Sequence, residues 1–88
     1  MVNYVIKFSS YAEKDKKKLK QAGLEEKARK LLDIISKNPF QNPPPFEKLR
    51  GDFSGCFSRR INIHYKLVYE IDEKHKEIHI LRMWTHYE

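Results

Sequence analysis

The sequence predicts one α+β domain of β-α-α-β-β-β order, with two helices packed on one face of a mostly antiparallel, twisted sheet. Its 88 residues suffice for a single domain and are too few for two. Helical periodicity is confined to residues 10–38, whereas alternating segments rich in β-branched and aromatic residues dominate residues 46–88. Because the helices come first and most strands follow them, we expect both helices to cover the same face of the sheet.

The N-terminal half begins with a strand and a helix. Residues 2–8, VNYVIKF, are rich in β-branched and aromatic side chains and predict the first strand. Residues 10–13, SYAE, match the S-x-x-E capping box, which opens a helix by satisfying its free N–H groups. We expect this helix to run to about Gln21, because Gly23 readily adopts the left-handed conformation that ends helices.

A second helix follows and ends at Asn38-Pro39, since the residue before a proline avoids the helical conformation. Its apolar side chains recur at helical spacing and form one stripe: Leu24, Ala28, Leu31, Leu32 and Ile35. The first helix is only weakly apolar, and its expected buried side consists of Tyr11, Ala12, Leu19 and Ala22.

The C-terminal half is predicted to be β-rich. Residues 39–52 form a proline-stiffened loop with a short extended piece, Phe46–Arg50. Two strands follow, joined by a tight turn near Asn62–Tyr65, and residues 77–88 form the last strand. The expected inward side chains are Phe57, Ile61, Ile63, Leu67, Tyr69 and Ile71, with either Ile78, Ile80 and Trp84 or Leu81 and Met83. Ser58, Arg60, Asn62 and Lys66 belong to the opposite face, which we expect to be open.

The charge balance favours a polyanionic partner. The formal net charge is +6 and the pI is about 9.5, which suits binding to RNA, DNA or an acidic protein segment, although a merely solvated basic surface is the simpler interpretation. No apolar run is long enough for a membrane helix and no secretion signal precedes the first strand, so we expect a cytoplasmic protein. The single cysteine, Cys56, excludes an internal disulfide and a cysteine-based zinc site.

Several polar side chains at strand positions or strand ends suit RNA cleavage: Glu47, Lys48, Arg50, Arg59, Arg60, Lys66, His86 and Tyr87. A base must take the proton of the 2′-hydroxyl, an acid must protonate the leaving 5′-oxygen, and cations must stabilise the charged phosphorane. No metal is required. Taken alone, Glu47 is better explained as an ordinary surface carboxylate paired with Arg50 than as a catalytic group. His75 and His79 would need a helix to share a metal ion, and their segment is predicted to be turn and strand.

The whole chain resembles a known family. FEKLRGDFSGCFSRRINIHYKLVYEID, followed by HILRMWTHYE, resembles the YoeB/Txe toxins of the RelE-like superfamily of toxin–antitoxin modules. The resemblance implies a RelE-like fold and a ribosome-dependent endoribonuclease that enters the A site, cuts mRNA and thereby inhibits translation. It implies a cognate antitoxin of the YefM/Axe type as partner, is compatible with a homodimer, and implies no cofactor and no metal. The alternatives are a non-catalytic RelE-like toxin and a basic domain that binds RNA or antitoxin.

The resemblance also assigns roles to individual residues. It makes Glu47 the general base, Arg60 the ligand of the scissile phosphate, His86 the acid on the 5′-oxygen, and Tyr87 the residue that orients the mRNA or stacks on a base. Where the family commonly has His-Arg, this chain has Tyr65-Lys66, so Lys66 is assigned to transition-state charge without the guanidinium fork. The expected RNA-binding residues are Lys48, Arg50, Phe53 and Arg59.

Overall fold

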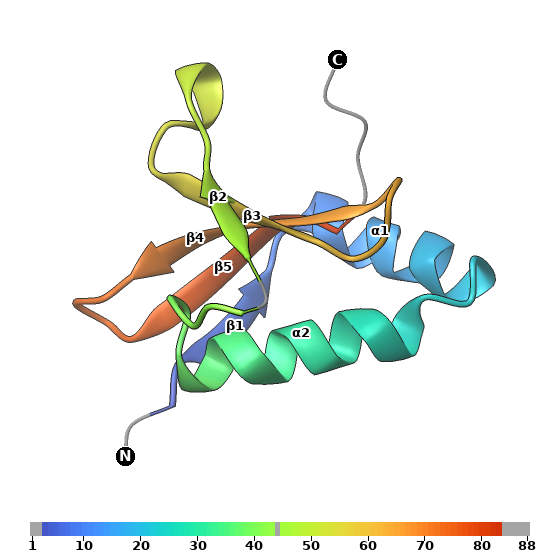
Figure 1. Cartoon of the computed structure of the whole chain (residues 1–88), viewed down its shortest axis with the longest axis horizontal. Coiled ribbons are helices and arrows are strands. Elements are labelled where there is room, and N and C mark those ends of the chain that lie inside the picture. Colours follow the sequence, from blue (N-terminus) through green and yellow to red (C-terminus); the bar gives the residue numbers. More distant parts are fainter. Residues whose placement is uncertain (1–2, 44, 84–88) are drawn as a thin grey trace.

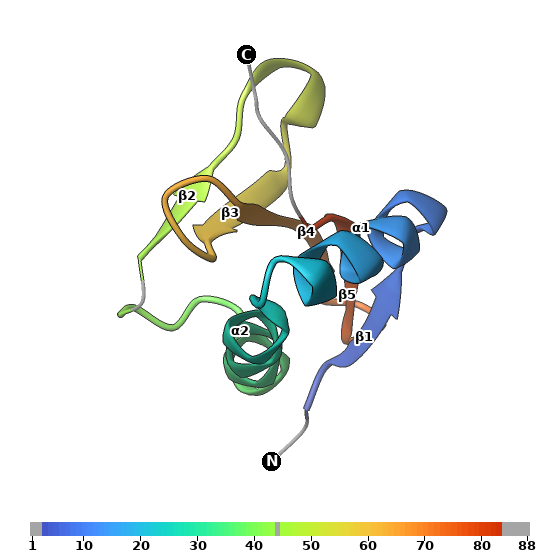
Figure 2. The same cartoon turned by 90° about the vertical axis from the view of Figure 1, so that its right-hand side faces the viewer.

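Two helices lie against one face of a five-stranded sheet in the computed structural model, which describes residues 3–43 and 45–83 (Figure 1). The elements are β1 (Val5–Phe8), α1 (Ser10–Gln21), α2 (Glu25–Lys37), β2 (Phe46–Lys48), a short 3₁₀ turn (Gly51–Phe53), β3 (Cys56–Arg60), β4 (Lys66–Asp72) and β5 (Glu77–Arg82). The rotated view in Figure 2 shows that α1 and α2 lie on the same side of the sheet. The predicted α+β class is therefore confirmed.

The strand order is β1-β5-β4-β3-β2. β5, β4, β3 and β2 are antiparallel neighbours, whereas β1 pairs with β5 in parallel. The last strand thus lies inside the sheet, beside the first, and its end comes close to α1. β2 is the opposite edge strand and is only three residues long.

The core lies between the helices and the sheet. The helices contribute their apolar stripes, and β4 and β5 contribute Leu67, Tyr69, Ile78 and Ile80, all of which are fully buried. This burial confirms the predicted stripe of α2 and the predicted inward face of β4. The described part of the chain contains no helix with the length and apolar character needed to cross a membrane.

The start of α1 lies one residue earlier than the capping-box pattern predicts. Ser9, not Ser10, is the N-cap: its Oγ accepts a hydrogen bond from the Ala12 N–H at 3.0 Å. The Ser9 hydroxyl also donates to the carbonyl of Leu81 at 2.8 Å, which fixes residue 9 against β5 and selects it as the cap.

The buried side of α1 also differs from the prediction. Ala12 and Leu19 are buried as expected, but Tyr11 is 63% exposed and Ala22 is exposed. Asp15 is buried in their place, 2% exposed, because its carboxylate accepts hydrogen bonds from Nε of Arg82 at 2.8 Å and from the Met83 N–H at 3.1 Å. This ion pair joins α1 to the end of β5.

Two strand predictions need correction. Ile63 is 78% exposed rather than inward, because β3 ends at Arg60 and Ile63 lies in the turn that follows. The Asn62 side chain builds that turn by accepting hydrogen bonds from the backbone N–H groups of His64 and Tyr65, each at 2.8 Å. β5 ends at Arg82, with Ile78, Ile80 and Met83 buried, and Trp84 lies outside the described residues.

Candidate active site

The sheet register brings three of the predicted catalytic residues onto one face. Glu47 of β2 is paired with Ser58 of β3, and Arg60 of β3 is paired with Lys66 of β4. Directly paired residues share a face and alternate residues of one strand do so too. Glu47, Ser58, Arg60 and Lys66 therefore lie together on the face turned away from the helices.

These four residues line a hollow of about 190 Å³, together with Pro45 and Phe46. Glu47 and Arg60 are exposed, Lys66 is partly exposed, and Ser58 is 3% exposed at the floor. A carboxylate and two cations thus border a cavity that an RNA phosphate and its neighbouring ribose can reach. Ser58 was placed on this face by its alternation with Arg60, but its place in the hollow follows only from the pairing with β2.

The cations of the hollow are arranged in a way that favours an anion. Arg60 and Lys66 are direct cross-strand partners, and like charges in such positions destabilise a sheet. A phosphate bound between Arg60 and Lys66 would attract both cations.

Arg59 does not belong to this face, and its predicted RNA contact is wrong for the described structure. It is 1% exposed and lies on the helix side of β3, paired with Phe46 and Leu67. Its guanidinium donates from Nε to the Tyr69 hydroxyl at 2.9 Å and from Nη2 to the carbonyls of Pro39 at 3.0 Å and Gln41 at 2.8 Å. These internal acceptors hold Arg59 inside the protein.

Two other predicted RNA-binding residues, Lys48 and Arg50, do not line the hollow. Lys48 is exposed but shares the opposite face of the sheet with its partner Phe57. Arg50 is exposed and immediately precedes the 3₁₀ turn. The side chain of Phe53, and both His86 and Tyr87, lie outside the described residues, so their predicted roles stay predictions.

The end of β5, from which residues 84–88 continue, is held by α1. The Met83 N–H donates to the buried Asp15 carboxylate, and Met83 itself is 2% exposed. Sequence reasoning missed Asp15, because it stands among lysines in a segment that looks like a solvated face.

His79 of β5 lies on the outer face beside two carboxylates. His79 lies between Glu77, with Nε2 2.9 Å from the carboxylate, and Glu70, with Nδ1 at 3.5 Å. The contacts with His79 and Lys7 hold the pKa of Glu77 below its usual range. Within residues 3–43 and 45–83, no three His, Cys, Asp or Glu side chains gather closely enough to hold a metal ion.

Two buried groups near the site have pKa values raised by burial. The Cys56 thiol is one, with the nearby Glu70 carboxylate adding to the shift. The Tyr69 hydroxyl is the other, although its hydrogen bond from Arg59 works in the opposite direction. A raised pKa keeps the Cys56 thiol protonated, which agrees with a packing role and not with a nucleophile.

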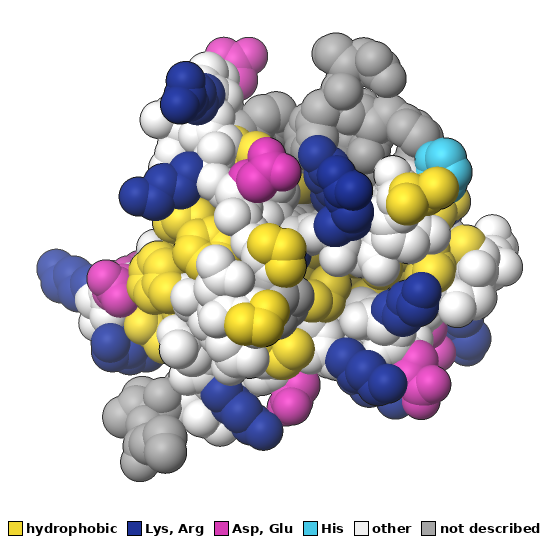
Figure 3. Space-filling model, viewed as in Figure 1, with side chains coloured by type: hydrophobic (Ala, Val, Ile, Leu, Met, Phe, Trp, Pro, Cys, Tyr) yellow, Lys and Arg dark blue, Asp and Glu magenta, His cyan; other side chains and the backbone are white. Residues whose placement is uncertain are grey.

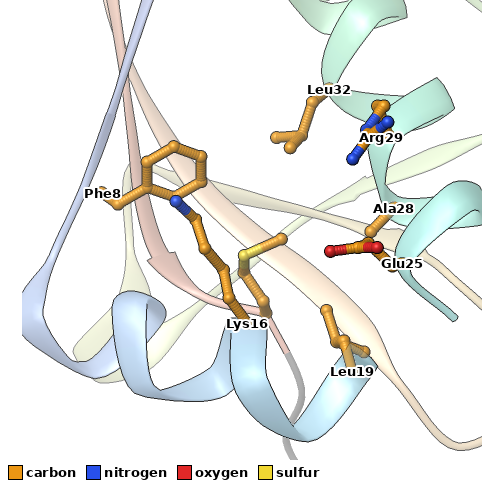
Figure 4. A pocket seen from close by; sticks show the side chains of 8 residues that line it. Phe8, Lys16, Leu19, Glu25, Ala28, Arg29 and Leu32 are labelled. Carbon is orange, nitrogen blue, oxygen red and sulfur yellow. The ribbon is translucent and has the colours of Figure 1, made fainter. Parts of the chain in front are cut away.

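A second hollow, of about 250 Å³, lies between β1 and the two helices (Figure 4). Its lining mixes apolar residues, such as Phe8 and Leu32, with charged ones, and the ammonium group of Lys16 stands 3.6 Å from the centre of the Phe8 ring. This hollow is larger and also has a carboxylate, Glu25, and two cations, Lys16 and Arg29, but the described residues that line it include none of the predicted catalytic residues. The sheet hollow is the candidate site because Glu47, Arg60 and Lys66 line it together.

Comparison with known proteins shows the family of this chain. Residues 5–87 match the model of the YoeB-like toxins of bacterial type II toxin–antitoxin systems. The chain belongs to this family. The toxin YoeB of Synechocystis sp. is 33% identical over 78 residues, which are 89% of this chain and 81% of that protein.

Solved structures of YoeB and RelE-like toxins share the fold. The YoeB dimer of Staphylococcus aureus is 32% identical, with a TM-score of 0.82 over 98% of this chain and 100% of that chain. The toxin–antitoxin complex RelBE2 of Mycobacterium tuberculosis is 29% identical, with a TM-score of 0.75 over 97% and 100%. The predicted membership of the YoeB family and the predicted RelE-like fold are both confirmed.

Proposed function

We propose that this YoeB-family toxin is a ribosome-dependent endoribonuclease that cuts mRNA in the A site and so inhibits translation. The observation that carries the proposal is the gathering of Glu47, Arg60 and Lys66 around one hollow on the open face of the sheet. A base and two cations are what attack by a ribose 2′-hydroxyl on its own phosphate requires.

The cleavage proceeds by acid–base chemistry. The Glu47 carboxylate takes the proton of the 2′-hydroxyl, whose oxygen attacks the adjacent phosphorus. Arg60 and Lys66 stabilise the added negative charge of the phosphorane. His86 protonates the departing 5′-oxygen, and Tyr87 orients the mRNA. The products are a 2′,3′-cyclic phosphate and a free 5′-hydroxyl, and no metal ion or cofactor takes part in a step.

The surroundings of Glu47 support a role as base. The simpler interpretation of Glu47 is a surface carboxylate paired with Arg50, and within the described part of the chain these two side chains form no ion pair. Glu47 is exposed at the rim of the hollow, so a ribose can approach it.

The proposed partner is a cognate antitoxin. The related toxin of S. aureus has been solved in a complex named YoeB–YefM, 32% identical with a TM-score of 0.80. We expect a YefM/Axe-like antitoxin with an acidic segment that covers the basic hollow and keeps the toxin inactive. The S. aureus dimer makes a homodimer a second expected assembly. Action on translating ribosomes places the toxin in the cytoplasm.

Primer extension on a defined mRNA, with and without translating ribosomes, tests the proposal. Wild type should produce cuts only when ribosomes are present, and Glu47→Gln and His86→Ala should each reduce cleavage to a small residual rate while antitoxin binding persists. Glu26→Gln, which neutralises an exposed carboxylate of α2, is the matched control and should cut normally. A wild-type protein that binds antitoxin but never cuts would contradict the proposal and favour a non-catalytic toxin.

A further inference from the structure

Arg59 is the largest fully buried side chain of the described structure. Burying a cation is unfavourable unless hydrogen bonds replace its hydration. Nε of Arg59 reaches the Tyr69 hydroxyl, and Nη2 reaches two backbone carbonyls, those of Pro39 and Gln41. The Pro39 carbonyl belongs to a buried residue and also receives the Tyr69 hydroxyl at a longer 3.5 Å, whereas Gln41 is an exposed residue.

Both carbonyls belong to the connection between α2 and β2. That connection starts at Asn38, the C-cap of α2, and ends directly before Phe46, the first residue of β2. Arg59 thus fastens the loop that leads into the strand carrying Glu47.

Arg59 also contacts β2 itself. It is the cross-strand partner of Phe46, and its guanidinium lies 5.0 Å from the centre of the Phe46 ring. The Phe46 ring packs edge-on against Phe40 and Phe57, with ring centres 6.4 and 5.8 Å apart. Phe46 is therefore anchored on the helix side of the sheet, and Glu47, the next residue, points to the other side.

The anchor matters because β2 has little else to hold it. It is a three-residue edge strand with a single neighbour, β3. Edge strands of this length lose their pairing easily, and a general base must stay within hydrogen-bond reach of its proton. A small displacement of β2 would move Glu47 away from Arg60 and Lys66.

We propose that Arg59 is a positioning residue for Glu47: it locks the α2–β2 loop and Phe46 so that the carboxylate stays at the hollow. The inference rests on the proposed ribonuclease function. Lysine cannot replace Arg59, because one ammonium group lacks the planar fork that serves the Tyr69 hydroxyl and both carbonyls at once.

Arg59→Lys tests the proposal, and Ile78→Val is the matched control. Ile78 is fully buried in β5, two strands away from β3, and Ile→Val costs about 0.5–1.5 kcal/mol without touching the loop. We expect Arg59→Lys to slow cleavage at saturating RNA by about tenfold or more with KM little changed, and Ile78→Val to cut normally. An Arg59→Lys protein with the wild-type cleavage rate would overturn the proposal.

A double variant distinguishes positioning from general loss of stability. If Arg59 acts through Glu47, Arg59→Lys should add little further loss in the Glu47→Gln background. Losses that multiply in the double variant would mean that Arg59 acts independently of Glu47, and would overturn the proposal.

Amide hydrogen exchange provides a readout that needs no ribonuclease activity. Exchange at Phe46–Lys48 should be faster in Arg59→Lys, while exchange in β4 stays near wild type. If Arg59→Lys does not fold, Tyr69→Phe removes the Nε acceptor and the long hydroxyl contact with the Pro39 carbonyl at 3.5 Å, keeps both Nη2 hydrogen bonds, and should show the same changes at smaller size. Unchanged exchange at Phe46–Lys48 overturns the inference. If no protein cuts RNA, wild type included, the proposed function fails, and exchange still decides the role of Arg59.

Discussion

Arg59 and Arg60 are neighbours in the chain with opposite environments. Arg59 is 1% exposed and fully engaged with internal acceptors, whereas Arg60 is exposed at the hollow. Strand alternation separates them, since adjacent side chains point to opposite faces. The same alternation that places Phe57 and Ile61 inward also places Arg59 inward. Sequence analysis usually assigns a cation such as Arg59 to the surface. Two of the acceptors that hold Arg59 inside come from the loop between α2 and β2, and the local sequence pattern does not predict where that loop lies.

In the proposed mechanism, Lys66 helps to stabilise the negative charge of the phosphorane. It keeps the cation of the usual arginine but not the two-pronged geometry. We expect Lys66→Ala to slow mRNA cleavage on the order of 10²-fold, and Lys66→Arg to cut at least as fast as wild type. Single-turnover cleavage on programmed ribosomes measures both. Wild-type cleavage by Lys66→Ala would show that Arg60 alone carries the phosphate charge.

His75 and Asp72 form an ion pair in the turn between β4 and β5, with Nδ1 2.8 Å from the carboxylate. The hydrogen bond and charge of Asp72 raise the pKa of His75 above 6.5, and the same contact holds the pKa of Asp72 below 3.8. The contribution of His75 to stability is therefore complete below pH 6.5 and lost as pH rises through its raised pKa. That of Asp72 is present above pH 3.8 and lost as pH falls through its lowered pKa.

NMR titration checks this pair directly. His75 should titrate above 6.5 in wild type and return towards 6.5 in Asp72→Asn, with a smaller decrease in Glu77→Gln, since Glu77 acts only through its more distant charge. An Asp72→Asn protein with an unchanged His75 titration would contradict the assignment.

At the scale of elements, local pattern predicts more than it misses. The apolar stripe of α2, the stop at Asn38-Pro39 and the turn after β3 follow from residues close in sequence, and the structure has all three. The misses involve partners that are distant in sequence. Ser9 caps α1 because it bonds Leu81, and Asp15 is buried because it bonds Arg82 and Met83.

The cap of α1 can be tested with adjacent serines. Ser9→Ala removes the hydrogen bonds to the Ala12 N–H and to the Leu81 carbonyl, and should lower the free energy of unfolding by about 1–2 kcal/mol. Ser10→Ala is the matched control and should have almost no cost, because alanine favours the helix interior. Urea unfolding of both variants is the measurement. A larger loss for Ser10→Ala would restore the capping box at residues 10–13.

The candidate site also combines features that the sequence predicts with features that depend on strand pairing. Residue types and the family resemblance were enough to nominate Glu47, Arg60 and Lys66. Their common face depends on the pairing of β2 with β3 and of β3 with β4, which the register defines. The exclusion of Lys48 and Arg59 from that face depends on the same register.

At the scale of the whole molecule, positive charge is not confined to the hollow. Figure 3 shows Lys and Arg side chains scattered over the viewed face, with Asp and Glu and hydrophobic side chains between them. Lys16 belongs to the structure there, since it pairs with Glu13 at 3.2 Å and lies over the Phe8 ring. On the proposed function, we expect exposed lysines of α1 such as Lys17 to contact ribosomal RNA.

Lys17→Glu tests this contact, and Lys74→Glu in the β4–β5 turn is the charge-matched control. Lys17→Glu should weaken binding to ribosomes and reduce the slope of log Kd against log salt by about 1, with little change in thermal stability. Lys74→Glu should do neither. Equal ribosome binding by Lys17→Glu and wild type would show that α1 is not the contact.

The central claim is that the toxin cuts mRNA through the RNA's own 2′-hydroxyl, with Glu47 as base. The most direct measurement uses ribosomes programmed with two mRNAs that differ only at the nucleotide before the cut, one ribose and one 2′-deoxyribose. We predict cleavage of the ribose mRNA, with a 2′,3′-cyclic phosphate end, and none of the deoxy mRNA. Cleavage of the deoxy mRNA at the same position would contradict the mechanism, because 2′-deoxyribose has no 2′-hydroxyl for Glu47 to deprotonate.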